Sequence, residues 1–109
     1  MKQILFAMPV VIVGLGAVLL AAPQDKDPKQ VYLDKCSVCH GADGKGQTAK
    51  GKKLKVKDVA SPEVRKMSDA DLLNVVLKGK GEDMDGFEKE LGADLSKKVT
   101  AYFRSLAKP

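Results

Sequence analysis

Cysteine and histidine side chains are confined to one short segment of this chain. The only two cysteines and the only histidine are Cys36, Cys39 and His40, in the run Cys-Ser-Val-Cys-His. A C-x-x-C-H run is typical of covalent attachment of a c-type haem, in which each cysteine sulfur forms a thioether to the porphyrin. The adjacent imidazole would then bind the iron from one face. The sequence therefore predicts haem attachment at both cysteines, with His40 as an axial ligand.

The spacing within this run suits that chemistry. Cysteines three residues apart lie on the same side of a helical turn, so both sulfurs can meet one edge of a porphyrin. Structural zinc needs four cysteine or histidine ligands, whereas the chain offers three, all close together. A thioredoxin-like redox pair needs a preceding strand and a βαβ context, and neither is evident. Zinc binding and disulfide chemistry are therefore weaker interpretations than haem attachment.

The second axial ligand cannot be a histidine, because the chain has only one. Met1 and Met8 lie in an N-terminal apolar segment, which leaves Met67 and Met84. Met84 lies between two aspartates in a polar loop, where a lone thioether has no evident packing role, while Met67 could be an ordinary core residue. We expect Met84 to be the ligand, with Met67 or an open, exchangeable position as the alternatives. His/Met ligation would raise the reduction potential relative to harder ligand pairs.

Helices are expected to position these residues. Asp27 followed by Pro28 predicts the start of a helix that runs into the cysteine segment. Ser68 predicts the start of a second helix, which Gly79 would close. A last helix is expected from about Asp94, because apolar residues recur there with the 3.6-residue period of a helix. Its apolar positions are Leu95, Val99, Tyr102, Phe103 and Leu106.

The segments between these helices are expected to be irregular. Residues 43–58 are rich in glycine and lysine and predict a loop, and residues 59–64 predict a short irregular stretch. A further loop over residues 79–86 would carry Met84. No stretch shows the alternation of a β-strand. The sequence therefore predicts an all-α domain of three to five short helices around a covalently attached haem.

The N-terminus has the layout of an export signal. A short basic start, residues 1–3, precedes an uncharged and mostly apolar run from Ile4 to Ala22, as in secretory signal peptides. The run also approaches the length that spans a bilayer. We therefore expect a signal peptide or uncleaved membrane anchor over residues 1–22, a linker over 23–27 and a folded domain over 28–109. The protein would be periplasmic, either soluble or anchored to the outer face of the inner membrane through residues 4–22.

Size and charge limit the remaining possibilities. The chain has 109 residues and a formal net charge of +5. Small domains of this kind often need a covalent or metal staple, because a small apolar core alone is marginal. All but two of the 19 basic residues are lysines, the exceptions being Arg65 and Arg104. This composition argues against nucleic-acid binding, which favours arginine, and fits an acidic protein partner or an anionic membrane surface.

The chain resembles the small monohaem class I c-type cytochromes over most of residues 28–107. The resemblance is carried by the spacing from Tyr32 to Cys36, the attachment segment 36–46, Gly79-Lys80-Gly81 followed by Met84 and Phe87, and residues 101–106. It implies a cytochrome c fold with one haem c bound by Cys36, Cys39, His40 and Met84. It also implies that the first and last helices cross near a right angle and brace the haem. The candidates for that contact are Tyr32, Val99, Tyr102 and Leu106.

Two departures from the family pattern concern the supports of the iron ligands. Asp85 follows Met84, where the family usually has proline, so this loop could be looser. The family commonly has a proline after the attachment motif whose carbonyl orients the ligand histidine, but no proline occurs from Gly41 to Ala60. The second nitrogen of His40 still needs an acceptor. We expect a backbone carbonyl within Lys50–Lys55 to fill that role.

These observations predict one-electron transfer between exported or membrane redox partners rather than catalysis, by a monomer or a complex subunit. The alternative is a membrane-anchored cytochrome c subunit of a larger oxidoreductase. A haem sensor or peroxidase is a third interpretation, which needs an open coordination position. Lysines could surround an exposed haem edge and steer an acidic partner, or could simply form a solvated surface. They are Lys45, Lys50, Lys52, Lys53, Lys55, Lys57, Lys78 and Lys80.

Overall fold

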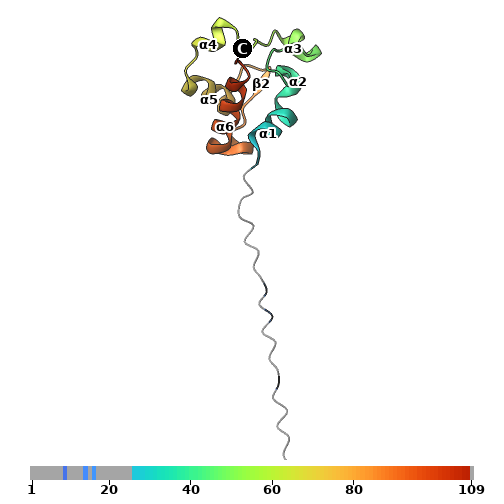
Figure 1. Ribbon diagram of the computed structural model, residues 1–109, viewed down its shortest axis with the longest axis vertical. Helices are drawn as coiled ribbons and strands as arrows, with labels where there is room; N and C mark the ends of the chain where they lie inside the picture. The colour runs from blue at the N-terminus through green and yellow to red at the C-terminus, as the bar shows by residue number, and fades with distance from the viewer. Residues whose placement is uncertain (1–8, 10–13, 15, 17–25, 109) are drawn as a thin grey trace, which may run out of the picture.

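The computed structural model describes residues 26–108 together with Pro9, Gly14 and Gly16 (Figure 1). The expected export segment over residues 1–22 therefore lies outside the described residues, apart from those three positions. The expected linker over 23–27 is described only at its last two residues. Among the described residues, no helix is long and apolar enough to cross a membrane.

Six helices and one small antiparallel sheet form the described domain. The bounds of the helices are Pro28–Lys35 (α1), Ser37–His40 (α2), Ala49–Leu54 (α3), Pro62–Lys66 (α4), Asp69–Lys78 (α5) and Glu88–Ser105 (α6). The two strands, β1 (Gly79–Lys80) and β2 (Met84–Asp85), pair within the predicted Met84 loop. The helical class predicted from the sequence is confirmed. The expected number of helices was too low, and the small sheet was not foreseen.

The two predicted helix starts are confirmed. The Asp27 carboxylate accepts a hydrogen bond from the Lys29 N–H at 3.1 Å, and Pro28 occupies the first position of α1. The Ser68 hydroxyl accepts from the Asp71 N–H at 3.0 Å and caps α5. These caps satisfy N–H groups that have no partner within the first turn of a helix.

Two short helices occur where the sequence predicted irregular segments. Within residues 43–58, the Thr48 hydroxyl accepts the Gly51 N–H at 2.9 Å and starts α3. Near the end of residues 59–64, Ser61 caps the Val64 N–H at 3.4 Å and Pro62 starts α4. Each of these helices is only six or five residues long. They are too short to show an apolar period, so only their caps mark them in the sequence.

The last helix begins before Asp94, the position expected for its start. Gly92 has φ 73° and ψ 170° and separates a first turn, which starts at Glu88, from the main body of α6. Glu88 pairs with Lys78 at 2.6 Å, and Glu90 pairs with Lys35. The turn before Gly92 is thus linked by exposed ion pairs to both α5 and α1.

The core lies where α1 meets α6, which Figure 1 shows side by side. Val31, Tyr32 and Val99 are buried there, and Tyr102 and Leu106 pack against them. The four contact residues expected from the resemblance therefore share one cluster. A second buried cluster, made of Val59, Val64 and Leu72, lies against α6 through Phe103 and Leu106. Since those two side chains touch both clusters, α6 joins the two halves of the core.

Candidate haem-binding site

The attachment segment forms a single helical turn, as its spacing predicted. Cys36 precedes α2, and its carbonyl accepts the His40 N–H at 2.9 Å. Cys36 and Cys39 are both partly buried and are free thiols rather than a disulfide. Burial raises the pKa of the Cys36 thiol to about 11. The two cysteines thus flank one helical turn, four residues and one residue before the histidine.

A cavity of about 580 Å³ lies against this turn. Cys36, Cys39, His40 and Met84 all line it. Its volume falls in the range of sites that hold a cofactor-sized ligand. Apolar side chains from the other helices complete its walls, among them Leu54, Val64, Leu72, Val75, Val76, Val99 and Phe103. The fold thus brings the four predicted site residues to one largely apolar space.

Burial favours the neutral form of the His40 imidazole. Burial lowers the pKa of its imidazole, and the neutral ring is the form that binds metals. The ring of Phe103 meets it edge-on, with centroids 5.2 Å apart. The Nδ1 atom is buried and has no hydrogen-bond partner among the described residues.

The carbonyl expected within Lys50–Lys55 does not accept a hydrogen bond from His40. The Gly51 carbonyl instead accepts from the Val56 N–H at 2.9 Å, and the Lys52 carbonyl accepts from the Lys55 N–H at 3.2 Å. The expectation was wrong because this segment is helical, so its own last turn uses these carbonyls.

Thr48 and Gly51 support the attachment turn in a way that the sequence analysis missed. The Thr48 hydroxyl, which caps α3, also donates to the Val38 carbonyl at 2.7 Å. A Cβ on Gly51 would lie 2.2 Å from the Cys39 carbonyl oxygen, so α3 packs directly on the backbone of α2. The cap signal at Thr48 could have revealed the helix, but only the fold reveals its contact with α2.

Tyr32 fixes the backbone that follows His40. Its phenol is 1% exposed and donates to the Gly41 carbonyl at 2.6 Å. Its ring lies 5.3 Å from that of Tyr102. Burial raises the pKa of Tyr32 above its ordinary value, an effect strengthened by the Cys36, Tyr102 and Asp43 charges. The sequence predicted Tyr32 as a contact between helices but not this hydrogen bond.

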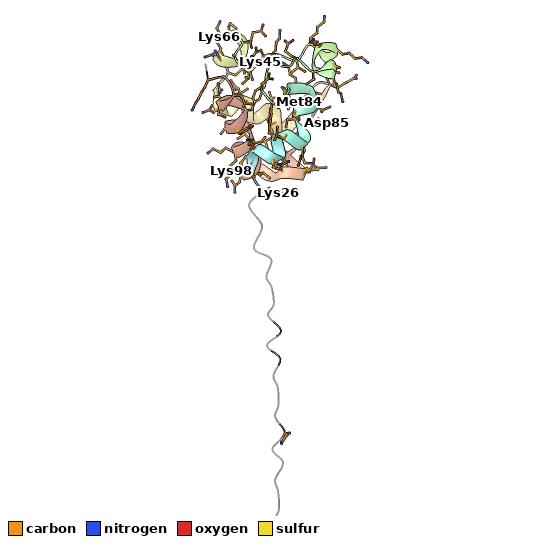
Figure 2. All side chains as sticks on the ribbon, turned by 45° about the vertical axis from the view of Figure 1, so that its right-hand side comes forward. Lys26, Lys45, Lys66, Met84, Asp85 and Lys98 are labelled. Carbon is orange, nitrogen blue, oxygen red and sulfur yellow. The ribbon has the colours of Figure 1, made fainter. Side chains whose placement is uncertain are left out.

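Met84 reaches the cavity from the β1–β2 hairpin, where it lies opposite Lys80. Figure 2 shows Met84 beside Asp85 in the middle of the domain, with Lys45 toward one end and Lys98 toward the other. Met67 also lines the cavity, but it packs against the cluster of Val59, Val64 and Leu72. The two methionines thus differ as predicted in their surroundings: one is on a hairpin and the other belongs to the core.

Lysines predominate among the charged residues that line the cavity. They come from α1, the α3 segment and the hairpin, and the acidic side chains of the lining are Asp83 and Asp85. Four of the eight lysines singled out in the sequence are among them: Lys50, Lys55, Lys57 and Lys80. Lys35 lines the cavity as well. Four of the eight expected lysines therefore lie at the cavity.

Comparison with known families bears directly on this site. Residues 23–103 match the family described as cytochrome c oxidase, cbb3-type, subunit III. The chain belongs to this family of c-type cytochromes. The identification as a small monohaem c-type cytochrome, made from the attachment motif and the methionine loop, is thereby confirmed. Membership implies a covalently bound haem c.

Solved structures of c-type cytochromes have the same fold. The structure of KustC0563, a c-type cytochrome, is 30% identical in sequence, with a TM-score of 0.69 over 76% of this chain and 100% of that one. A tyrosine-to-phenylalanine mutant of Kustc0563 is 28% identical, with a TM-score of 0.67 over 74% of this chain and 99% of that one. No curated protein sequence matches the chain significantly.

The residues of this cytochrome fit haem c. Two free thiols lie on one turn, a neutral imidazole and a thioether line the same cavity, and apolar side chains form most of its walls. A metal-bound imidazole is usually oriented by a hydrogen bond from its second nitrogen, and the buried Nδ1 of His40 has no such acceptor among the described residues.

Proposed function

We propose that this cytochrome carries single electrons between exported or membrane-bound redox proteins. The observation that carries the proposal is the convergence of Cys36, Cys39, His40 and Met84 on one cavity. The bound haem would supply an iron that exchanges one electron reversibly, without a chemical product. With both axial positions filled by this chain, no substrate position remains, so the protein would not be an enzyme.

The chain's own groups determine how such a centre behaves. Cys36 and Cys39 would tether the porphyrin, and His40 and Met84 would bind the metal from two sides. A thioether favours the reduced metal, and His/Met ligation gives a raised potential. Phe103, Val99 and Leu72 limit water at the cavity walls, which disfavours the additional charge of the oxidised state.

Lysines at the cavity support a partner with an acidic docking surface. Lys50, Lys55 and Lys80 line the cavity and are not paired with a carboxylate among the described residues. Complementary charge accelerates encounter more than it strengthens the final complex. We infer that the protein acts in the periplasm, which the apolar run over residues 4–22 supports.

A membrane-anchored subunit of a larger oxidoreductase is the second candidate. The family name refers to a subunit of an oxidase, and the apolar run could remain as an anchor. The match to KustC0563 covers the whole of that c-type cytochrome and leaves both candidates open. Membrane fractionation separates the two: a carrier with a cleaved signal is released without detergent, whereas a subunit is extracted together with partner chains.

Optical spectra of the purified holoprotein test the ligand set. The ferric wild type should show the weak sulfur-to-iron band of methionine ligation, and the ferrous form should not bind carbon monoxide. Met84→Ala should lose the band and bind the gas. Met67→Leu conserves volume at the other methionine and should behave as the wild type.

Two outcomes would contradict this assignment. If the band survived Met84→Ala but disappeared in Met67→Leu, the ligand would be Met67. Absence of the band in the wild type, together with carbon monoxide binding, would replace the carrier with a protein that has an open position.

A further inference from the structure

The methionine hairpin lies directly against the end of α5 without intervening side chains. β1 continues from the last residue of α5, and Gly79 pairs with Asp85 while Lys80 pairs with Met84. In the view of Figure 1, β2 lies between α5 and α2. The Phe87 N–H donates to the Val76 carbonyl at 2.8 Å and joins the chain after the hairpin to the same helix.

Two glycines make this close approach possible. A Cβ on Gly79 would lie 2.4 Å from the Met84 carbonyl oxygen and 2.7 Å from the Gly86 nitrogen. A Cβ on Gly86 would lie 2.5 Å from the Leu77 carbonyl oxygen. All these atoms belong to the backbone, so no side-chain rotation can relieve the overlap. A methyl group at either position must therefore move the strand that carries Met84 away from α5.

We propose that Gly79 and Gly86 are positioning residues that set the reach of the Met84 thioether into the cavity. Gly79 lies against the backbone of Met84, Asp85 and Gly86, and Gly86 lies against the backbone at the end of α5, so both sides of the methionine are held in place. These contacts would hold the hairpin in place even though Asp85 follows Met84, where related cytochromes usually have proline. The inference rests on the proposed role of Met84 as an axial ligand. It adds that two glycines, which would not bind the haem themselves, hold this ligand in position.

Gly92 supplies a matched control for backbone strain. Gly79 has φ 83° and ψ −178°, and Gly92 has φ 73° and ψ 170°, a region that only glycine populates readily. Nothing lies within 4 Å of a Cβ built on Gly92. Alanine at Gly92 therefore adds strain alone, while alanine at Gly79 adds strain and overlap. Gly86 has no positive φ, so alanine there adds overlap alone.

The experiment compares holoproteins of the wild type, Gly79→Ala, Gly86→Ala, Gly92→Ala and Met84→Ala. We expect Gly79→Ala and Gly86→Ala to lose the methionine band of the ferric form and to bind carbon monoxide when reduced, as Met84→Ala does. Gly92→Ala should keep the band at wild-type intensity although its melting temperature falls. Haem content and far-ultraviolet circular dichroism should match the wild type in all five proteins.

The possible failures are distinct. Retention of the band in Gly86→Ala, or its loss in Gly92→Ala, would overturn the positioning role. Loss of haem or of helical structure in both crowded variants would also overturn it, by assigning the glycines to folding. If instead Met84→Ala were spectrally identical to the wild type, the proposed ligand itself would be wrong, whatever the glycine variants show.

Discussion

Tyr32 connects the first helix to the backbone that follows His40. Its buried phenol donates to the Gly41 carbonyl, and its ring packs between Tyr102 and Phe103. Gly41 has φ 80° and turns the chain away at the end of α2. A side chain of α1 thus stabilises the backbone next to His40.

The phenol should make stability sensitive to alkaline pH. Its pKa is raised in the folded protein, so the unfolded chain releases the proton first as pH rises. The contribution of Tyr32 is complete below its ordinary pKa of 10.0 and is lost progressively above it. Tyr32→Phe should cost about 1 kcal/mol at neutral pH through the missing hydrogen bond, and this difference should shrink above pH 10.

Guanidinium unfolding of both holoproteins, at neutral pH and in steps above pH 10, measures this change. Tyr102 is present in both proteins and cancels in the comparison. A difference in unfolding free energy that stays constant across the alkaline range would show that Tyr32 is not the group responsible.

Individual residues were predictable to the extent that their chemistry is local. Cys36, Cys39 and His40 could be assigned from spacing alone, because one helical turn determines their arrangement. The sequence favoured Met84 over Met67 because of its polar loop, and the structure places both methionines at the cavity. The bond from Tyr32 to Gly41 and the unpaired Nδ1 of His40 depend on how α1 and α3 pack, which no local pattern specifies.

At the level of elements, α3 supports the attachment turn. The Thr48 hydroxyl takes part in three hydrogen bonds: it accepts the one that caps α3, and it donates to the Val38 and Cys39 carbonyls of α2. Gly51 allows the two helices to touch backbone to backbone. The lysine-rich segment over residues 43–58 looks like a solvated loop in sequence. In the structure it also supports the turn that carries the two cysteines.

Thr48→Val should destabilise the holoprotein by about 2 kcal/mol, because it removes both the helix cap and the link to α2 with little change of volume. Ser68→Ala is the matched control: it removes a single cap, that of α5, and should cost about 1 kcal/mol. Chemical denaturation of the two variants measures the difference. If both variants lost the same free energy of unfolding, the bonds from the Thr48 hydroxyl to α2 would contribute nothing to stability.

Long helices were more predictable than short ones. The starts of α1 and α5 are readable from their capping residues, and the apolar stripe of α6 is readable because several turns repeat it. The helices α3 and α4 and the first turn of α6 are each too short to repeat it. Their stability comes from caps, ion pairs and packing against neighbours, so the sequence alone underestimated the number of helices.

At the level of the whole molecule, the cavity lies beside both parts of the core. The buried cluster at the α1–α6 contact and the cluster of Val59, Val64 and Leu72 meet through Phe103 and Leu106. Val64, Leu72 and Val99 from these clusters also line the cavity. A cofactor in this space would therefore complete the apolar core of a small domain.

Because lysines predominate among the charged residues at the cavity, the rate of reaction with an anionic oxidant should depend on salt concentration. We expect the rate at which ferricyanide oxidises the ferrous protein to fall as ionic strength rises, because salt screens the attraction. Lys50 and Lys55 line the cavity, so Lys50→Gln and Lys55→Gln should each weaken the dependence of the rate on ionic strength. Lys98→Gln removes the same charge from a position outside the cavity lining, toward the other end of the domain from Lys45 (Figure 2), and should leave the dependence nearly unchanged.

Stopped-flow kinetics over a series of salt concentrations supplies the rates. A rate that is independent of ionic strength, or an equal effect of all three substitutions, would show that these lysines form only a solvated surface and do not attract the oxidant.

An optical redox titration of the purified holoprotein tests the central claim most directly. The account predicts a single, fully reversible one-electron transition, with the same midpoint potential in the oxidative and reductive directions. Because His40 and Met84 would fill both axial positions, saturating the solution with carbon monoxide should leave this midpoint unchanged. An irreversible transition, or a midpoint that carbon monoxide raises, would contradict the account, since it would show a metal with an open position instead of an electron carrier.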